Sequence, residues 1–156
     1  KFSVLTDCTL HTKVQEQRFI KDRLGRSDQQ HLLMFCAKVG KLDMLRFLKD
    51  EVNFTIEDFR AADNDAIRTA ARHNHMNVLR FLYNEVNLTP DDFRPLIYVA
   101  SHKSVDIPLE LLRFLKDEVG LTVDNFRARD NLPMIFADEL NFPDVIDFLN
   151  DNFGIL

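Results

Sequence analysis

Several residue types on which particular functions depend are scarce in this chain. Its 156 residues contain two cysteines, four glycines and no tryptophan. Two thiols cannot build a disulfide framework, so we expect a reducing, cytoplasmic environment. The glycines are too few and too scattered for a phosphate-binding loop. No apolar run approaches the roughly 20 residues of a membrane span, and the apolar stretch near the first residue is too short for a signal peptide.

Basic residues are also in deficit. The chain has 20 lysines and arginines against 25 aspartates and glutamates, which gives a formal net charge of −5. Proteins that bind nucleic acids or membrane surfaces through charge normally carry a basic surplus. We therefore expect neither nucleic acid nor a membrane surface as the ligand.

One sequence segment occurs three times in the chain with small variations. It reads LRFLKDEVNFTIEDFR over residues 45–60 and returns over 79–94 and 112–127, with a truncated copy from Ile146. The copies start 34, 33 and 34 residues apart. A fixed period of this size is typical of an all-α solenoid whose neighbouring repeats share one core. The predicted domain has about four repeats, over residues 27–60, 61–94, 95–127 and 128–156.

Each repeat is expected to contain two helices joined by a tight turn. In the first repeat the pattern predicts a helix over 31–39, stopped by Gly40, and a second helix over 42–52. The next repeat has Asn74 in place of Gly40, and asparagine is the best non-glycine residue for left-handed backbone. We therefore expect the same turn in both repeats.

A third, short helical turn is predicted at the end of each repeat. Thr55, Thr89 and Thr122 stand where it begins, and threonine is a preferred N-cap residue. Pro90 follows Thr89 at the first helical position, which tolerates proline best. The phenylalanine four residues after each threonine should point into the core between repeats, and these residues are Phe59, Phe93 and Phe126.

Residues 1–26 lie outside the repeats. A helix over residues 9–24 is predicted from an apolar side formed by Leu10, Val14, Phe19 and Leu24. Two interpretations stay open: this helix caps the exposed end of the first repeat, or it is the tail of a preceding domain. The segment that follows it, residues 27–30, reads as a capping box that opens the next helix.

The paired helices and their turns read CAKVGKLDMLRFL over 36–48 and AARHNHMNVLRFL over 70–82. Both resemble the Ala-Ala-x-x-Gly-His-x-x-x-Val-x-x-Leu-Leu centre of ankyrin repeats, and the resemblance covers about residues 28–156. The Thr-Pro-Leu-His opening is missing, and the short helical turn replaces the usual β-hairpin. Divergent, Phe-Arg-rich repeats of this kind are similar to those in effectors of intracellular bacteria and in proteins of protists and large DNA viruses. The resemblance implies a binding scaffold and suggests a host-directed effector that acts in the host cytosol.

In ankyrin-like arrays the stacked first helices form a concave wall that contacts partners. A mostly cationic set of side chains is predicted near that wall, namely Met34, Lys38, Arg68, Arg72, His73, Tyr98, His102 and Lys103, with Asp138 as a further candidate. A basic wall favours a protein partner with an acidic or mixed surface, and Tyr98 and the arginines are plausible anchors. The alternative is that these charges only solvate one side of each helix.

The repeated arginines Arg60, Arg94 and Arg127 leave two interpretations open as well. They form a ladder that binds a ligand, or they hold exposed carbonyls or carboxylates within the array. Repetition at the same place in every unit favours the structural role, because such residues usually serve the folding of the unit.

No metal or catalytic site is predicted. His73 and His75 flank the second turn but lack further ligands at the spacing that zinc requires. Cys8 with His11, or Cys36 with any histidine, would supply a nucleophile and a base, yet no Cys–His signature is present. Cys36 reads instead as a small packing residue between two helices.

These patterns predict a monomeric protein–protein interaction scaffold without cofactor or enzymatic activity. Two alternatives remain. The chain is the targeting or regulatory domain of a larger enzyme, or it is a Cys–His hydrolase.

Overall fold

All of the regular secondary structure in the described part of the chain is helical. The structure is a computed structural model, and it describes residues 10–100, 108–139 and 141–154. These ranges contain no strand, which confirms the all-α prediction for them, and no helix long and apolar enough to cross a bilayer. In chain order the helices are α1 (Leu10–Arg23), α2 (Arg26–Val39), α3 (Leu42–Asp50), α4 (Ile56–Arg72), α5 (Met76–Asn84), α6 (Pro90–Phe93), α7 (Leu96–Ala100), α8 (Pro108–Arg113), the π-helical turn η1 (Phe114–Glu118), α9 (Val123–Glu139) and α10 (Pro143–Phe153).

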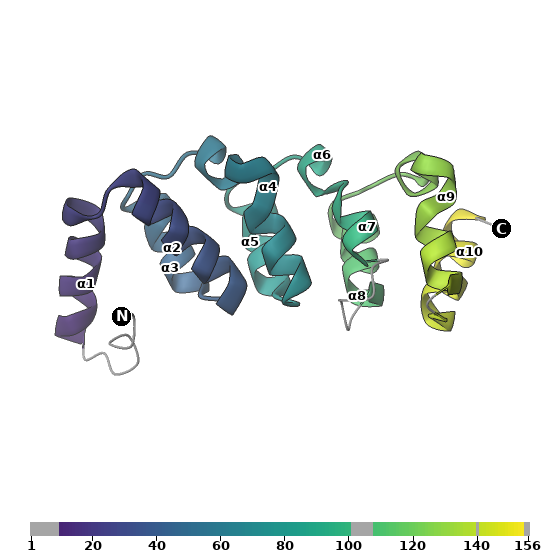
Figure 1. Cartoon of the computed structure of the whole chain (residues 1–156), viewed down its shortest axis with the longest axis horizontal. Helices are drawn as coiled ribbons and strands as arrows, with labels where there is room; N and C mark the ends of the chain where they lie inside the picture. Colours follow the sequence, from purple (N-terminus) through teal and green to yellow (C-terminus); the bar gives the residue numbers. More distant parts are fainter. Residues whose placement is uncertain (1–9, 101–107, 140, 155–156) are drawn as a thin grey trace.

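Most helices belong to four pairs that follow one another along the long axis of the molecule (Figure 1). The pairs are α2/α3, α4/α5, α7/α8 and α9/α10, which we number one to four. We call the earlier member of each pair its first helix and the later member its second helix. Each first helix contacts the next one, since α2 packs on α4, α4 on α7 and α7 on α9. The second helices α3 and α5 also touch, as do α8 and α10.

The turns inside the first two pairs have the predicted left-handed backbone. Gly40 has φ +73°, and Asn74 has φ +56°. The His75 ring of the second pair lies so close that a Cβ added at Gly40 would stand 2.6 Å from its Nδ1 atom. Glycine at the first turn is therefore required twice, by the backbone conformation and by the neighbouring pair.

Threonine caps open the short turns, as predicted. The backbone N–H and hydroxyl of Thr55 donate to the Asp58 carboxylate at 2.7 and 2.9 Å. Thr89 makes the same two bonds to Asp92, both at 2.8 Å, and Pro90 is the first residue of α6. Each carboxylate satisfies an N–H that the helix itself leaves unpaired.

Helix α4 contains a sharp bend that separates its short first turn from the first helix of the second repeat. Ala62, Asp63 and Asn64 all have left-handed backbone, with φ values of +53°, +58° and +60°. Such a conformation costs a non-glycine residue about 1–2 kcal/mol, so it needs support from outside the segment. Arg68 gives that support by donating to the Asp63 carboxylate at 3.0 Å and to the Ala62 carbonyl at 3.1 Å.

The repeated phenylalanines lie in the core between sequence repeats, as predicted. Phe59 is 1% exposed, and Phe93 and Phe126 are fully buried. Phe59 packs edge-to-face on Phe81 of the second pair, with ring centroids 6.0 Å apart. Phe93 packs in the same way on Phe114 of the third pair at 5.8 Å. The same aromatic contact thus joins successive sequence repeats, from α4 to α5 and from α6 to η1.

Two details near the start of the described chain differ from expectation. Helix α1 occupies nearly the predicted range, but Phe19 is 57% exposed, and Ile20 is the residue that is buried. The predicted capping box over 27–30 is wrong, because α2 already begins at Arg26. The Gln29 side chain instead donates to the carbonyls of Ile20 and Leu24, so it ties α2 to α1.

Candidate functional site

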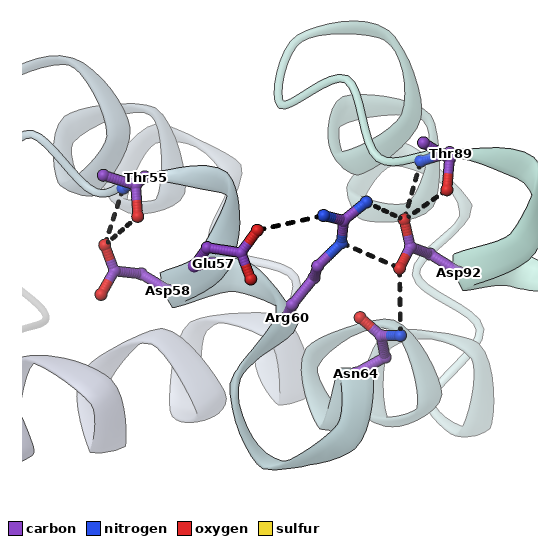
Figure 2. Close-up of polar contacts among 7 residues, drawn as sticks. All are labelled: Thr55, Glu57, Asp58, Arg60, Asn64, Thr89 and Asp92. Carbon is purple, nitrogen blue, oxygen red and sulfur yellow. Dashed lines mark hydrogen bonds and ion pairs between the residues drawn. The ribbon is translucent and has the colours of Figure 1, made fainter.

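Arginines of successive turns form a row of contacts between repeats, which we call the turn ladder. Arg26 donates through Nε to Asp58 Oδ1 at 3.1 Å and also pairs with Oδ2 through Nη2. Arg60 donates to both oxygens of Asp92, at 3.0 and 2.8 Å. Figure 2 shows that the carboxylate of Asp92 also accepts hydrogen bonds from Thr89. One side chain therefore caps a helix and binds the arginine of the preceding turn.

The turn ladder changes the acidity of its carboxylates. Burial alone would raise the pKa of Asp92, but hydrogen bonds from Arg60 and Thr89 outweigh burial and lower the pKa to about 2. The same opposition, with bonds from Thr55 and Arg26, lowers the pKa of Asp58. Both carboxylates are therefore ionised at neutral pH, and each rung is a charge-assisted contact.

A second row of contacts, the helix ladder, joins the second helices. Arg46 of α3 pairs with Glu85, which follows α5, at 2.6 Å, and Arg80 of α5 pairs with Glu118 of η1 at 2.8 Å. The hydrogen bond from Arg46 lowers the pKa of Glu85. Arginines on the second-helix side of the first two pairs are thus occupied by neighbouring repeats.

The contacts of the repeated arginines support their structural interpretation at two of the three positions. Arg60 is a rung of the turn ladder. Arg127 donates to the carbonyls of Phe153 and Gly154, at 2.9 and 3.2 Å. Within the described chain Arg94 pairs only with Asp91 of its own turn, at 3.5 Å.

Four of the predicted binding residues are exposed on first helices or next to them. Lys38 lies near the end of α2, Arg72 ends α4, His73 follows it, and Asp138 lies near the end of α9. Lys38 and Arg72 form no ion pair with any residue that the structure describes. Both cations are therefore unpaired among the described residues.

The other predicted binding residues are placed differently. Arg68 is committed to the bend in α4, and its side chain is 27% exposed. Met34 and Tyr98 are half-buried, and Met34 packs against the core. His102 and Lys103 lie outside the described residues. The structure thus leaves Lys38, Arg72 and His73 as the exposed part of the predicted cationic set.

Sequence reasoning missed three apolar residues on the same face. Phe35 and Val39 of α2 are 50% and 40% exposed, one helical turn apart, and Ile135 of α9 is 44% exposed. Ile135 stands six residues before the left-handed Asn141, as Met34 stands six before Gly40. Counting back from these turns was the signal that could have found it.

We call this set of exposed residues the first-helix face: Phe35, Lys38, Val39, Arg72, His73 and Ile135. Residues 35, 38 and 39 follow the i, i+3, i+4 spacing that places side chains on one side of a helix. The face therefore combines apolar groups with unpaired cations.

Catalytic and metal chemistry find little support in the described residues. Cys36 is 2% exposed, and burial raises the pKa of its thiol to about 12, against a smaller opposing effect of Lys41. His75 shares a hydrogen bond of 2.8 Å with the Lys38 carbonyl. No group of three metal-ligating side chains occurs in the ranges searched. Cys8 lies outside the described residues.

A groove of about 660 Å³ lies between α1 and α3. Its charged lining is Arg18, Lys21 and Asp22 on the α1 side, and Asp43, Arg46, Asp50 and Glu51 on the α3 side. Lys21 stands 3.9 Å from Glu51 across the groove. Its opposed charges attract the two helices to each other.

No family model, curated protein or solved structure matches this chain. Its function is therefore inferred from its own residues.

Proposed function

We propose that the chain is a divergent ankyrin-like repeat scaffold that binds a protein partner through the first-helix face. One observation carries this proposal. The large hydrophobic side chains that are exposed in the described pairs, Phe35, Val39 and Ile135, all belong to first helices. The described part of the second helices exposes none of comparable size.

The distribution of charge on the two sides points in the same direction. On the second-helix side of the first two pairs, Arg46 and Arg80 are held by glutamates of the next pair. On the first-helix side, Lys38 and Arg72 have no such partner among the described residues, and Phe35 lies one turn before Lys38. Aromatic and cationic anchors surrounded by smaller contacts are typical of protein interfaces.

The chemistry of the face selects the kind of partner. Exposed cations favour a partner that carries carboxylates, because complementary charge speeds association and excludes basic competitors. Phe35 and Val39 add an apolar contact that a purely acidic polymer would not satisfy. We therefore propose a protein segment that presents acidic and apolar side chains together.

The ankyrin-like solenoid belongs to the same proposal. It is supported by the period of 33–34 residues, by the helix pairs that share left-handed turns, and by the contacts between successive first helices. Stacked pairs of this kind present their first helices as one continuous surface, which is how repeat proteins bind extended partners.

Affinity capture from a eukaryotic cell lysate tests the proposal. The bait is compared with a triple variant, Phe35→Ala/Lys38→Ala/Arg72→Ala, and with a matched triple on the second-helix side, Asp43→Ala/Asn77→Ala/Arg113→Ala. All six positions are exposed, so both triples should retain the helical content of the parent by circular dichroism.

We expect a partner that the parent and the second-helix triple capture equally and that the first-helix triple loses. Capture of the same partner by all three proteins would move the site off this face. Failure of all three to capture a partner would instead favour a regulatory module that acts within a longer chain.

A further inference from the structure

Both ladders of ion pairs stop at the same boundary, the one between the third and fourth helix pairs. In the turn ladder, Asp58 and Asp92 receive the arginine of the preceding turn. Asn125 holds the corresponding position in the next turn, three residues after Thr122. This turn therefore has no carboxylate at the position that would pair with Arg94.

The helix ladder ends in the same way. Glu85 and Glu118 receive Arg46 and Arg80 from the preceding pair. By the 34-residue spacing of the last two repeats, the position that corresponds to Glu118 is occupied by Asn152. Its amide donates to the Phe148 carbonyl of its own helix at 2.8 Å.

The amide at Asn125 removes charge without removing the helix cap. Its side-chain oxygen accepts the Thr122 N–H at 2.8 Å and the Thr122 hydroxyl at 3.1 Å, as the aspartates do in the earlier turns. Arg94 then pairs only with Asp91 among the described residues. At this boundary Asn125 stands where the earlier turns have an aspartate, and Asn152 stands where the earlier pairs have a glutamate. Both positions lose a negative charge, while the local helix persists.

The second helix before this boundary is also less regular than its counterparts. Helix α8 passes into the π-helical turn η1, whereas α3 and α5 are α-helical throughout. A cleft of about 260 Å³ opens between α8 and α10, lined by Arg113, Asp144, Asp147 and Asp151 among others. None of these aspartates forms an ion pair with Arg113 in the described structure.

The fourth pair nevertheless has contacts of its own that hold it together. The rings of Phe126 and Phe153 stack with centroids 4.3 Å apart. Arg127, the next residue, donates to the Phe153 carbonyl at 2.9 Å. The start of α9 and the end of α10 are thus joined within one unit.

We propose that this unit, residues 123–153, opens separately while the first three pairs stay folded. In a repeat array the stability is approximately a sum of terms within each unit and between neighbours, so the boundary with the weakest interface opens first. A partly exposed ion pair makes only a modest contribution to stability. The absence of two such pairs should therefore raise the equilibrium constant for opening of this unit by roughly ten-fold. The opening is confined to the C-terminal end because the first pair keeps both rungs to its neighbour.

Native-state hydrogen exchange, read by mass spectrometry at low denaturant, measures this opening directly. In the parent chain, amides of α10 should be at least about ten-fold less protected than those of α3 and α5. A repaired variant, Asn125→Asp/Asn152→Glu, supplies carboxylates opposite Arg94 and Arg113. It should raise the protection of α10 toward that of α5 and leave α3 unchanged.

A second variant adds the same kind of boundary one pair earlier in the chain. Asp92→Asn/Glu118→Asn gives the junction of the second and third pairs the same amides, and Asn125 shows that the cap survives this change. Because Asn125 and Asn152 are unchanged in this variant, amides of α10 should still exchange first, and amides of α7 and η1 should now also exchange ahead of those of α3 and α5.

Equal protection of α10 and α5 in the parent would overturn the proposal. So would a repaired variant whose α10 amides exchange as fast as those of the parent, because simple fraying of the last helix does not depend on these two side chains.

Discussion

Replacing Asp92 by asparagine removes one negative charge from a carboxylate of the turn ladder. Asp92 is 8% exposed and accepts hydrogen bonds from Arg60, Thr89 and Asn64 (Figure 2). The amide oxygen of asparagine can still cap the helix, as Asn125 does. The substitution therefore isolates the charged interaction with Arg60.

The magnitude follows from the pKa of Asp92. Its value falls from an ordinary 3.8 to about 2 in the folded protein, and this difference corresponds to about 2 kcal/mol of stability at neutral pH. The Thr89 bonds supply part of this stabilisation and asparagine keeps them, so the share lost with the Arg60 ion pair is about 1 kcal/mol. For a urea dependence of about 2 kcal/mol per molar, Asp92→Asn should lower the unfolding midpoint by roughly 0.5 M. Asp92→Ala also loses the cap and should cost about 1 kcal/mol more.

The contribution of Asp92 to stability depends on pH. The folded-state pKa is depressed, so the contribution of Asp92 is complete above pH 3.8 and disappears as the pH falls through about 2. Urea unfolding of the parent and of Asp92→Asn, followed by circular dichroism, should therefore differ at pH 7 and converge near pH 2. Because other carboxylates titrate in the same range, the quantity compared is the difference between the two proteins.

Asp91→Asn is the matched control for this experiment. Asp91 is the neighbouring residue, its side chain is 84% exposed, and among the described residues it pairs only with Arg94 at 3.5 Å. Its substitution should change stability by no more than about 0.5 kcal/mol. If Asp92→Asn costs no more than this control at pH 7, the rung between Arg60 and Asp92 does not stabilise the array as argued.

Three further predictions concern the core, the bend and the thiol. Phe81→Ala should destabilise by about 3–5 kcal/mol through loss of buried ring contacts, while Arg72→Ala should change stability by less than about 0.5 kcal/mol, and equal losses in urea titrations would show that the faces are assigned wrongly. Ala62→Gly should stabilise by about 1 kcal/mol, because glycine adopts the left-handed backbone at φ +53° without strain, and an unchanged melting temperature would contradict this. In a Cys8→Ser background, Cys36 should react with iodoacetamide slowly in the native state at pH 8 and rapidly in urea, whereas fast native alkylation would mean that the thiol is not buried as described.

The period, the helices and their caps were predictable because they depend on chemistry close in sequence. Thr55 and Thr89 cap helices through residues three positions away, and Gly40 and Asn74 specify their turns by their own backbone preference. The burial of Phe59 was also predictable, because an aromatic residue that recurs once per repeat has only the shared core in which to lie.

The bend in α4 was not predictable in the same way. Ala62 carries no signal for left-handed backbone, and Arg68 reads in the sequence as one cation among several. The segment adopts its conformation because contacts from Arg68, and from Asn64 to the next turn, compensate for its local cost. Arg68 was consequently assigned to the binding surface, although in the structure its hydrogen bonds stabilise the bend in α4.

The sequence marks Arg60 and Asp92 as repeated residues, but their contact across 32 positions depends on how far one pair is displaced from the next. The same applies to Phe35, since its apolar side chain suggests the core and its 50% exposure follows from which side of α2 the neighbouring helices cover. Local propensity is a property of a few adjacent residues and can be read from them. Packing between pairs depends on residues far apart in the sequence, and it determines which arginines are paired and which side chains remain exposed.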